Sequence, residues 1–126
     1  MNSYNFSTHS LRLDVANQDI EVRNISEGLP GSLVGTFAID ADQNWLKIWR
    51  DGDQIKLDRT SEPNNYDTYT LDGGDFQVNQ DGGILTIDIR DPTRSQEPFT
   101  FPLDNSSHYI LLRMDNAGDL HLYYND

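Results

Sequence analysis

Short runs in which apolar and polar residues alternate recur along this chain, and turn-forming residues separate them. The turns follow one another at about 8–12 residues, a spacing that is typical of an all-β sandwich or barrel. No window carries the i, i+3, i+4, i+7 pattern of an amphipathic helix over three turns. The pattern predicts an all-β fold, an antiparallel meander of about nine to eleven short strands without substantial helix, in a small barrel or a two-sheet sandwich.

The length of 126 residues fits one domain, residues 1–126. We leave flexibility open for residues 1–9, which precede the first expected strand. Residues 60–67 and 91–98 are polar, contain proline and are expected to be loops. The expected strands are 11–15, 20–22, 31–39, 45–50, 54–58, 68–71, 76–79, 84–90, 99–103, 108–114 and 120–124.

The dipeptide Asp51-Gly52 lies between two alternating runs and predicts a two-residue hairpin turn. A loop formed by these two residues pairs Ile48 with Ile55 and gathers the apolar side chains on one face. The other face of this hairpin then carries six residues, with Lys47 directly opposite Lys56: Trp45, Lys47, Trp49, Gln54, Lys56 and Asp58.

Three further turns set the register of the second half of the chain. A Gly73-Gly74 loop pairs Tyr69 with Val78, and an Asp81-Gly82 loop pairs Val78 with Leu85, which predicts a three-stranded meander. For the last hairpin, a three-residue loop that ends at Gly118 suits the left-handed backbone of its last position. That loop places Arg113 opposite His121 and Leu111 opposite Tyr123.

The face with the two tryptophans is the strongest candidate for a binding site. The chain has only two Trp and two Lys, and the expected register collects all four on one face of one hairpin. Exposed Trp rings can stack on sugars, flat ligands or partner side chains. In the alternative, a second sheet covers this face and the lysines reach the rim. The candidate binding residues are Trp45, Lys47, Trp49, Lys56, Arg113, His121 and Tyr123.

Asp40, Asp42 and Asn44 place oxygen-bearing side chains at alternate positions, a spacing that calcium loops use. The segment departs from an EF-hand loop, because Trp45 stands where that loop needs glycine. The alternative is a polar turn between two strands. Calcium at this segment is the one metal that the sequence suggests, and no other cofactor is expected. The absence of cysteine excludes disulfides and thiolate metal sites.

The formal net charge of −12 opposes binding to nucleic-acid phosphates and to anionic membranes, and it permits binding to a basic protein surface. The sequence contains no nucleophile elbow and no phosphate-binding loop, and no pattern selects a catalytic pair of carboxylates. We therefore expect that the protein is not an enzyme.

The leading expectation is an acidic protein–protein interaction domain of the inhibitor, immunity or assembly type, which engages a basic partner surface. One alternative is a carbohydrate-binding β domain that uses Trp45 and Trp49 as a stacking platform. Another is a barrel that binds a small ligand inside. We expect a monomer or a dimer formed through a sheet edge. The start of the chain lacks the basic and apolar regions of a secretion signal, and no stretch of about 20 apolar residues occurs, so a cytoplasmic location is expected.

Overall fold

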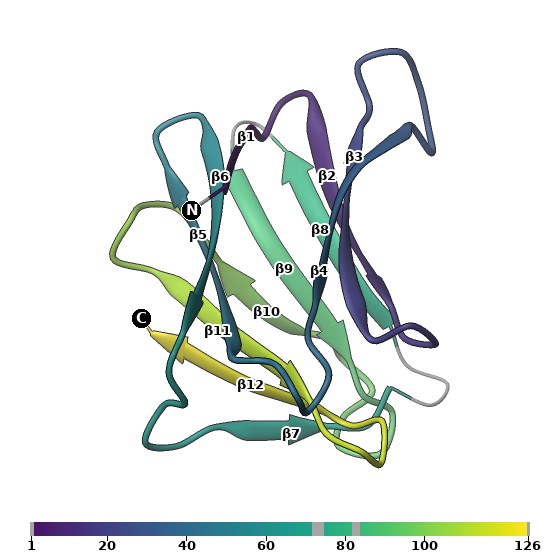
Figure 1. The fold of residues 1–126 in the computed structure, drawn as a ribbon, viewed down its shortest axis with the longest axis vertical. Coiled ribbons are helices and arrows are strands. Elements are labelled where there is room, and N and C mark those ends of the chain that lie inside the picture. The colour runs from purple at the N-terminus through teal and green to yellow at the C-terminus, as the bar shows by residue number, and fades with distance from the viewer. Residues whose placement is uncertain (1, 72–74, 82–83, 126) are drawn as a thin grey trace.

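A computed structural model describes residues 2–71, 75–81 and 84–125, and side chains are described for all of these except 75, 80, 81 and 84 (Figure 1). The described residues form twelve β-strands and no helix, so they contain no helix that could span a membrane. The strands are β1 (Asn2–Asn5), β2 (His9–Asp14), β3 (Asp19–Asn24), β4 (Ser32–Ala38), β5 (Trp45–Asp51), β6 (Gln54–Thr60), β7 (Asp67–Tyr69), β8 (Asp75–Asp81), β9 (Ile84–Arg90), β10 (Phe99–Pro102), β11 (Tyr109–Met114) and β12 (Leu120–Asn125).

The strands form three antiparallel sheets that pack in a sandwich-like arrangement. One layer is a six-stranded sheet with the order β1-β6-β5-β11-β12-β7. The other layer contains the sheets β2-β3-β4 and β10-β9-β8, which meet where β2 lies beside β8 (Figure 1). The sandwich expectation is confirmed. The described strands do not close into a barrel, which corrects the alternative of a barrel that encloses a small ligand.

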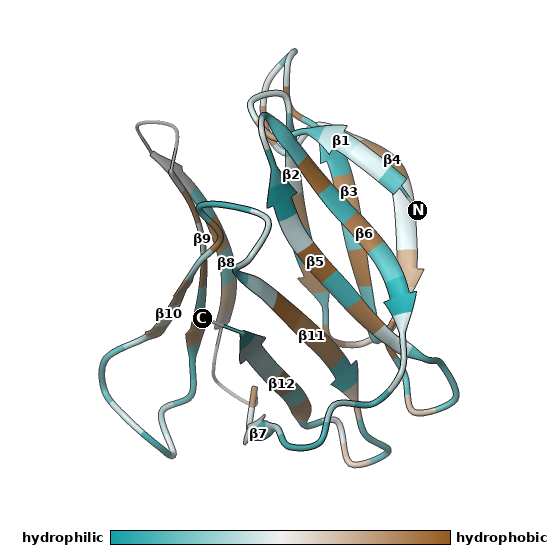
Figure 2. Cartoon of the chain, turned by 90° about the vertical axis from the view of Figure 1, so that its left-hand side faces the viewer, coloured by the Kyte–Doolittle hydropathy of each residue, from teal (hydrophilic) through white to brown (hydrophobic). Residues whose placement is uncertain are grey.

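A single apolar core lies between the two layers. Hydrophobic and hydrophilic residues alternate along β5 and β6 (Figure 2), and the aliphatic residues Leu46, Ile48, Ile55 and Leu57 are buried in the core. Side-chain contacts join the two layers near both edges of the six-stranded sheet. Tyr4 of β1 approaches Gly35 of β4, and Tyr69 of β7 packs edge-on against Phe99 of β10 with ring centroids 5.2 Å apart. The fully buried aliphatic residues include Ile20, Ile39, Leu46, Ile48, Ile55, Leu57, Leu85, Ile87, Ile89, Leu103 and Ile110.

The hairpin of β5 and β6 confirms the expected faces but corrects the expected partners. Asp51 pairs with Gln54, so the loop consists of Gly52 and Asp53 rather than of Asp51 and Gly52. Gly52 has φ +60°, as the first residue of a type II′ turn requires. The register differs by two residues, and because strand side chains alternate with a period of two, the same residues still point inward. The cross-strand partners change: Lys47 lies opposite Asp58, and Trp49 lies opposite Lys56.

The hairpin of β8 and β9 shows the same two-residue difference. Val78 pairs with Ile87 rather than with Leu85, and Asp81 pairs with Ile84. The expected Gly73-Gly74 loop and Gly82 of the Asp81-Gly82 loop lie outside the described residues. The expected pairing of Tyr69 with Val78 is wrong, because Tyr69 pairs with Leu120 and β7 joins the six-stranded sheet.

The last hairpin has the expected register throughout. Arg113 pairs with His121, Leu111 pairs with Tyr123, and Gly118 has φ +87°. At the other end of the chain, the segment for which we left flexibility open contains β1, which pairs with β6 and so extends the six-stranded sheet. Phe6, directly after β1, is buried.

Candidate functional site

The pairing of β5 with β11 brings the two groups of expected binding residues onto one surface. Trp49 pairs with Tyr109, and Lys47 pairs with Leu111, which in turn pairs with Tyr123. Cross-strand partners share a face of the sheet. All seven expected residues therefore lie on the side of the six-stranded sheet that faces away from the core, which we call the outer face: Trp45, Lys47, Trp49, Lys56, Arg113, His121 and Tyr123.

At one end of the outer face, the loop of residues 61–66 covers Trp45. The indole is only 1% exposed, and its ring centroid lies 5.1 Å from that of Tyr66 and 6.3 Å from that of His121. Tyr66 itself stacks on His121, with centroids 4.6 Å apart. Trp45 is thus packed under a loop and is not available as a stacking platform. The expectation that Trp45 and Trp49 together form such a platform is wrong, because only Trp49 is partly exposed.

A contact with Asp115, in the hairpin of β11 and β12, holds the His121 side chain in place. Its Nε2 lies 2.9 Å from Oδ2 of Asp115, whose Oδ1 accepts the amides of Ala117 and Asp119. Burial alone raises the pKa of Asp115, but these hydrogen bonds outweigh it, and the pKa lies below the ordinary value of 3.8. Asp115 therefore organises the turn and orients the imidazole ring with the same carboxylate.

Two buried donors accompany this ring cluster. Within the part of the chain that the structure describes, the indole Nε1 of Trp45 and the Nε of Arg113 have no hydrogen-bond acceptor. Buried polar groups are normally paired with protein or with ordered water.

At the other end of the outer face, a lysine lies among aromatic rings. The Lys47 Nζ is 4.4 Å from the ring centroid of Tyr109 and 4.8 Å from that of Trp49. Such cation–π contacts favour one orientation of the rings. Tyr123 lies beside Tyr109, with ring centroids 6.3 Å apart. Lys56 forms an ion pair with Asp51 at 3.1 Å and is directed toward the hairpin end.

A groove of about 340 Å³ runs between the 61–66 loop and the sheet. Its floor consists of Tyr109, Leu111 and Tyr123, and residues 60–65 form its wall. The wall is rich in hydroxyl, amide and carboxylate groups, whereas the floor is aromatic and aliphatic. Sequence reasoning did not identify the wall, because an irregular loop gives no periodic signal. Tyr109 was detectable, since it alternates with Leu111 and Arg113 on the same strand face.

The segment with Asp40, Asp42 and Asn44 forms a polar turn. The Asp40 Oδ1 accepts the amide of Asp42, and the Asp40 carbonyl accepts the amide of Gln43. The Asn44 carbonyl accepts a hydrogen bond from the Arg59 guanidinium. Among the described residues, no group of three or more His, Asp and Glu is placed to hold a metal ion. The turn thus has a structural explanation that does not involve calcium.

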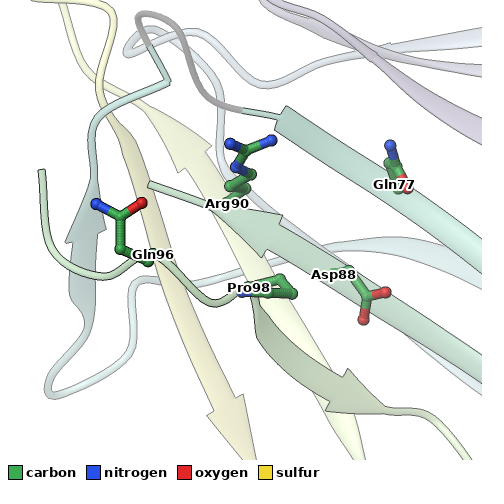
Figure 3. A pocket seen from close by; sticks show the side chains of 5 residues that line it. All are labelled: Gln77, Asp88, Arg90, Gln96 and Pro98. Carbon is green, nitrogen blue, oxygen red and sulfur yellow. The ribbon is translucent and has the colours of Figure 1, made fainter. Parts of the chain in front are cut away.

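A second groove, of about 290 Å³, lies on the sheet formed by β8, β9 and β10 (Figure 3). Its lining comprises four polar or charged residues and one proline: Gln77, Asp88, Arg90, Gln96 and Pro98. The Asp88 Oδ2 accepts a hydrogen bond from Asn79. This groove lacks aromatic side chains, and no sequence pattern indicates it.

Comparisons with protein-family models, with curated proteins and with solved structures found no match.

Proposed function

We propose that the protein is a non-enzymatic domain that binds carbohydrate in the groove of the outer face. The observation that carries this proposal is the combination of an aromatic floor, Tyr109 and Tyr123, with a polar wall formed by residues 60–65. Ligand sites in proteins typically combine apolar and aromatic surface with a few polar groups that fix orientation, in volumes of about 300–1,000 Å³.

The floor suits the apolar side of a sugar ring. Tyrosine rings provide flat apolar surface and also a hydroxyl group at the edge. Leu111, which pairs with Tyr123, lies on the same face and adds aliphatic surface to the floor. A sugar that lies on this floor would bury its C–H groups, while its hydroxyl groups would point to the wall.

The wall supplies partners for those hydroxyl groups. Ser61, Glu62, Asn64 and Asn65 offer both donors and acceptors within a short segment. Sugar hydroxyls act as donors and acceptors at once, so a mixed lining of this kind matches them. The segment is anchored at its end by the stacking of Tyr66 on His121, which limits the cost of ordering it when a ligand binds.

The acidic protein–protein interaction domain remains the second candidate, and the net charge of −12 favours it. Three of the nine Lys and Arg residues lie on the outer face: Lys47, Lys56 and Arg113. The two lysines face carboxylates, Asp58 opposite Lys47 and Asp51 in an ion pair with Lys56, so the outer face does not concentrate the negative charge that would attract a basic partner, and such a partner would bind elsewhere. The two candidates differ in salt dependence, because association with a basic partner weakens as ionic strength rises, whereas sugar stacking does not.

The test is a glycan array followed by calorimetric titration of the sugars that bind. Trp49 pairs with Tyr109 at the edge of the groove, so its fluorescence gives a second signal of binding. We expect Tyr109→Ala to weaken binding about tenfold or more, equivalent to ~1.4 kcal/mol, and Tyr109→Phe to retain it. If no sugar in a broad panel binds at about 10 mM, or if Tyr109→Ala binds as the wild type does, the proposal is wrong.

A further inference from the structure

The edges of the three sheets are protected to different degrees. An open edge can pair with another chain unless it is short, charged, interrupted by proline or covered. β1, β7 and β10 have four, three and four residues, and β10 ends in Pro102. β2 carries Arg12 and Asp14, β8 begins and ends in Asp, and these two edges adjoin each other. Among the described strands, β4 is the exception.

β4 is an edge strand of seven residues, and it contains neither a charge nor a proline. The uncharged stretch extends from Gly28 to Ile39, in a chain of which 24% is charged. Three of the five large apolar side chains that are exposed among the described residues lie on this stretch: Leu29 at 82%, Leu33 at 50% and Val34 at 45%. An uncharged apolar surface of this length is unusual for a chain with such a high net charge.

The pairing of β4 with β3 explains why neighbouring apolar residues are both exposed. Gly35 pairs with Val22 and Leu33 pairs with Arg23, which leaves Val34 as an extra residue in a β-bulge. The bulge is confined to the start of the strand. From Gly35 to Ala38 the pairing is regular, so the second half of β4 has the backbone geometry that a further strand can join.

We propose that β4 is a self-association surface, at which the β4 edges of two copies of this chain pair antiparallel about a twofold axis. A twofold contact brings the same patch of each copy together, so any charge in the patch would meet its own sign. Two molecules that each carry a net charge of −12 can therefore meet at low electrostatic cost only through an uncharged surface. β4 is such a surface, and it offers no carboxylate to a basic partner.

The proposed dimer should be weak, and its affinity should rise with the salt concentration. A stable interface buries about 800 Å² on each partner, and a single strand pair with a few apolar side chains provides less. The overall repulsion between two acidic molecules falls as salt screens it. Self-association should therefore increase with ionic strength, which is opposite to the behaviour expected for binding to a basic partner.

The test is analytical ultracentrifugation of the full chain over a range of concentrations, in ~0.05 M and ~0.5 M salt. We expect a monomer–dimer equilibrium that shifts toward dimer as concentration and salt rise. Val34→Lys and Thr36→Lys place a lysine on the exposed edge and should each weaken association about tenfold or more. Val15→Lys is the matched control, since Val15 is also 45% exposed but lies in the turn after β2.

Hydrogen exchange identifies the surface involved. Within residues 35–38, the amides that point away from β3 should exchange more slowly at concentrations where the dimer forms. Circular dichroism should show that all three variants are folded. A wild type that stays monomeric at high concentration in both salts overturns the proposal, even if β4 accepts a strand from another protein. Association that both lysine variants on β4 leave unchanged also overturns it, because the dimer would then use another surface.

Discussion

Tyr66 stacks on His121 with 4.6 Å between the ring centroids, and this contact attaches the 61–66 loop to the six-stranded sheet. The two residues lie on different elements, since His121 belongs to β12 and Tyr66 to a segment without regular structure. Beneath them lies the buried indole of Trp45. The Tyr66 ring therefore covers Trp45 and also attaches the groove wall to the sheet.

Replacement of Tyr66 by Ala should uncover Trp45. Tyr66 is 41% exposed, so the loss of its aromatic contacts should lower the free energy of unfolding by only about 0.5–1.5 kcal/mol. Acrylamide should then quench the tryptophan fluorescence more strongly, and the emission should shift to longer wavelength. Tyr66→Phe keeps the stacked ring and serves as the control. Unchanged quenching in Tyr66→Ala would show that the loop stays in place without this contact.

Acid should destabilise the protein partly through Asp115. Its carboxylate accepts two amides and contacts His121, and its pKa in the folded state lies below the ordinary value of 3.8. A lowered pKa means that the stabilisation is complete above the unfolded-state pKa of about 3.9 and is lost as the pH falls through the folded-state pKa. Between about pH 5 and pH 2, the free energy of unfolding should fall less steeply in Asp115→Asn than in the wild type.

The measurement is urea unfolding across this pH range. The other carboxylates with lowered pKa, such as Asp91, are present in both proteins. They therefore make the same contribution to the change of the free energy of unfolding with pH. The difference in stability between wild type and variant should shrink toward the acid end. A constant difference at every pH would mean that Asp115 is protonated equally in the folded and unfolded states.

The alternation of apolar residues allowed the faces of the strands to be predicted, but not the partners of strands distant in the sequence. Trp49 and Tyr123 were each assigned to a face of their own hairpin. Their place on one surface depends on the pairing of β5 with β11, and no turn connects these strands. The pairing of Tyr69 with Leu120 was missed for the same reason.

The two Asp-Gly hairpins show a second limit of prediction from the sequence, which concerns the register of paired strands. In both, the Asp that was assigned to the loop is the last paired residue of its strand, Asp51 in one and Asp81 in the other. A shift of two residues leaves every side chain on its expected face, so the apolar pattern cannot detect it. Trp45 shows a third limit of prediction from the sequence. The loop that buries Trp45 has no periodic pattern, so the position of this loop could not be derived.

Gly118 should resist replacement for reasons of backbone conformation alone. Its φ is +87°, and a Cβ built there meets no atom within 4 Å. We therefore expect Gly118→Ala to lower the free energy of unfolding by about 1 kcal/mol or slightly more, through strain without steric contact. Gly118→Asn should cost less, because Asn adopts the left-handed region more readily. Equal effects of the two substitutions in thermal unfolding would contradict this explanation.

Asp91 should be the most sensitive of the acidic residues, because it is the one charged side chain that is buried among the described residues. Its carboxylate accepts the Thr70 amide at 2.8 Å and the Thr93 amide at 3.0 Å, and so connects the residue after β7 to the loop after β9. Asp91→Ala leaves both amides without this acceptor, and it should lower the free energy of unfolding by about 3 kcal/mol.

Chemical denaturation at neutral pH measures this effect, with Asp42→Ala as the control. Asp42 is exposed in a turn, so its replacement should change the stability by no more than about 0.5 kcal/mol. Asp91→Asn should fall between the two, because its amide retains one oxygen acceptor but turns a donor toward one of the backbone amides. If Asp91→Ala were as stable as Asp42→Ala, the hydrogen bonds that Asp91 accepts from Thr70 and Thr93 would contribute little to the free energy of unfolding.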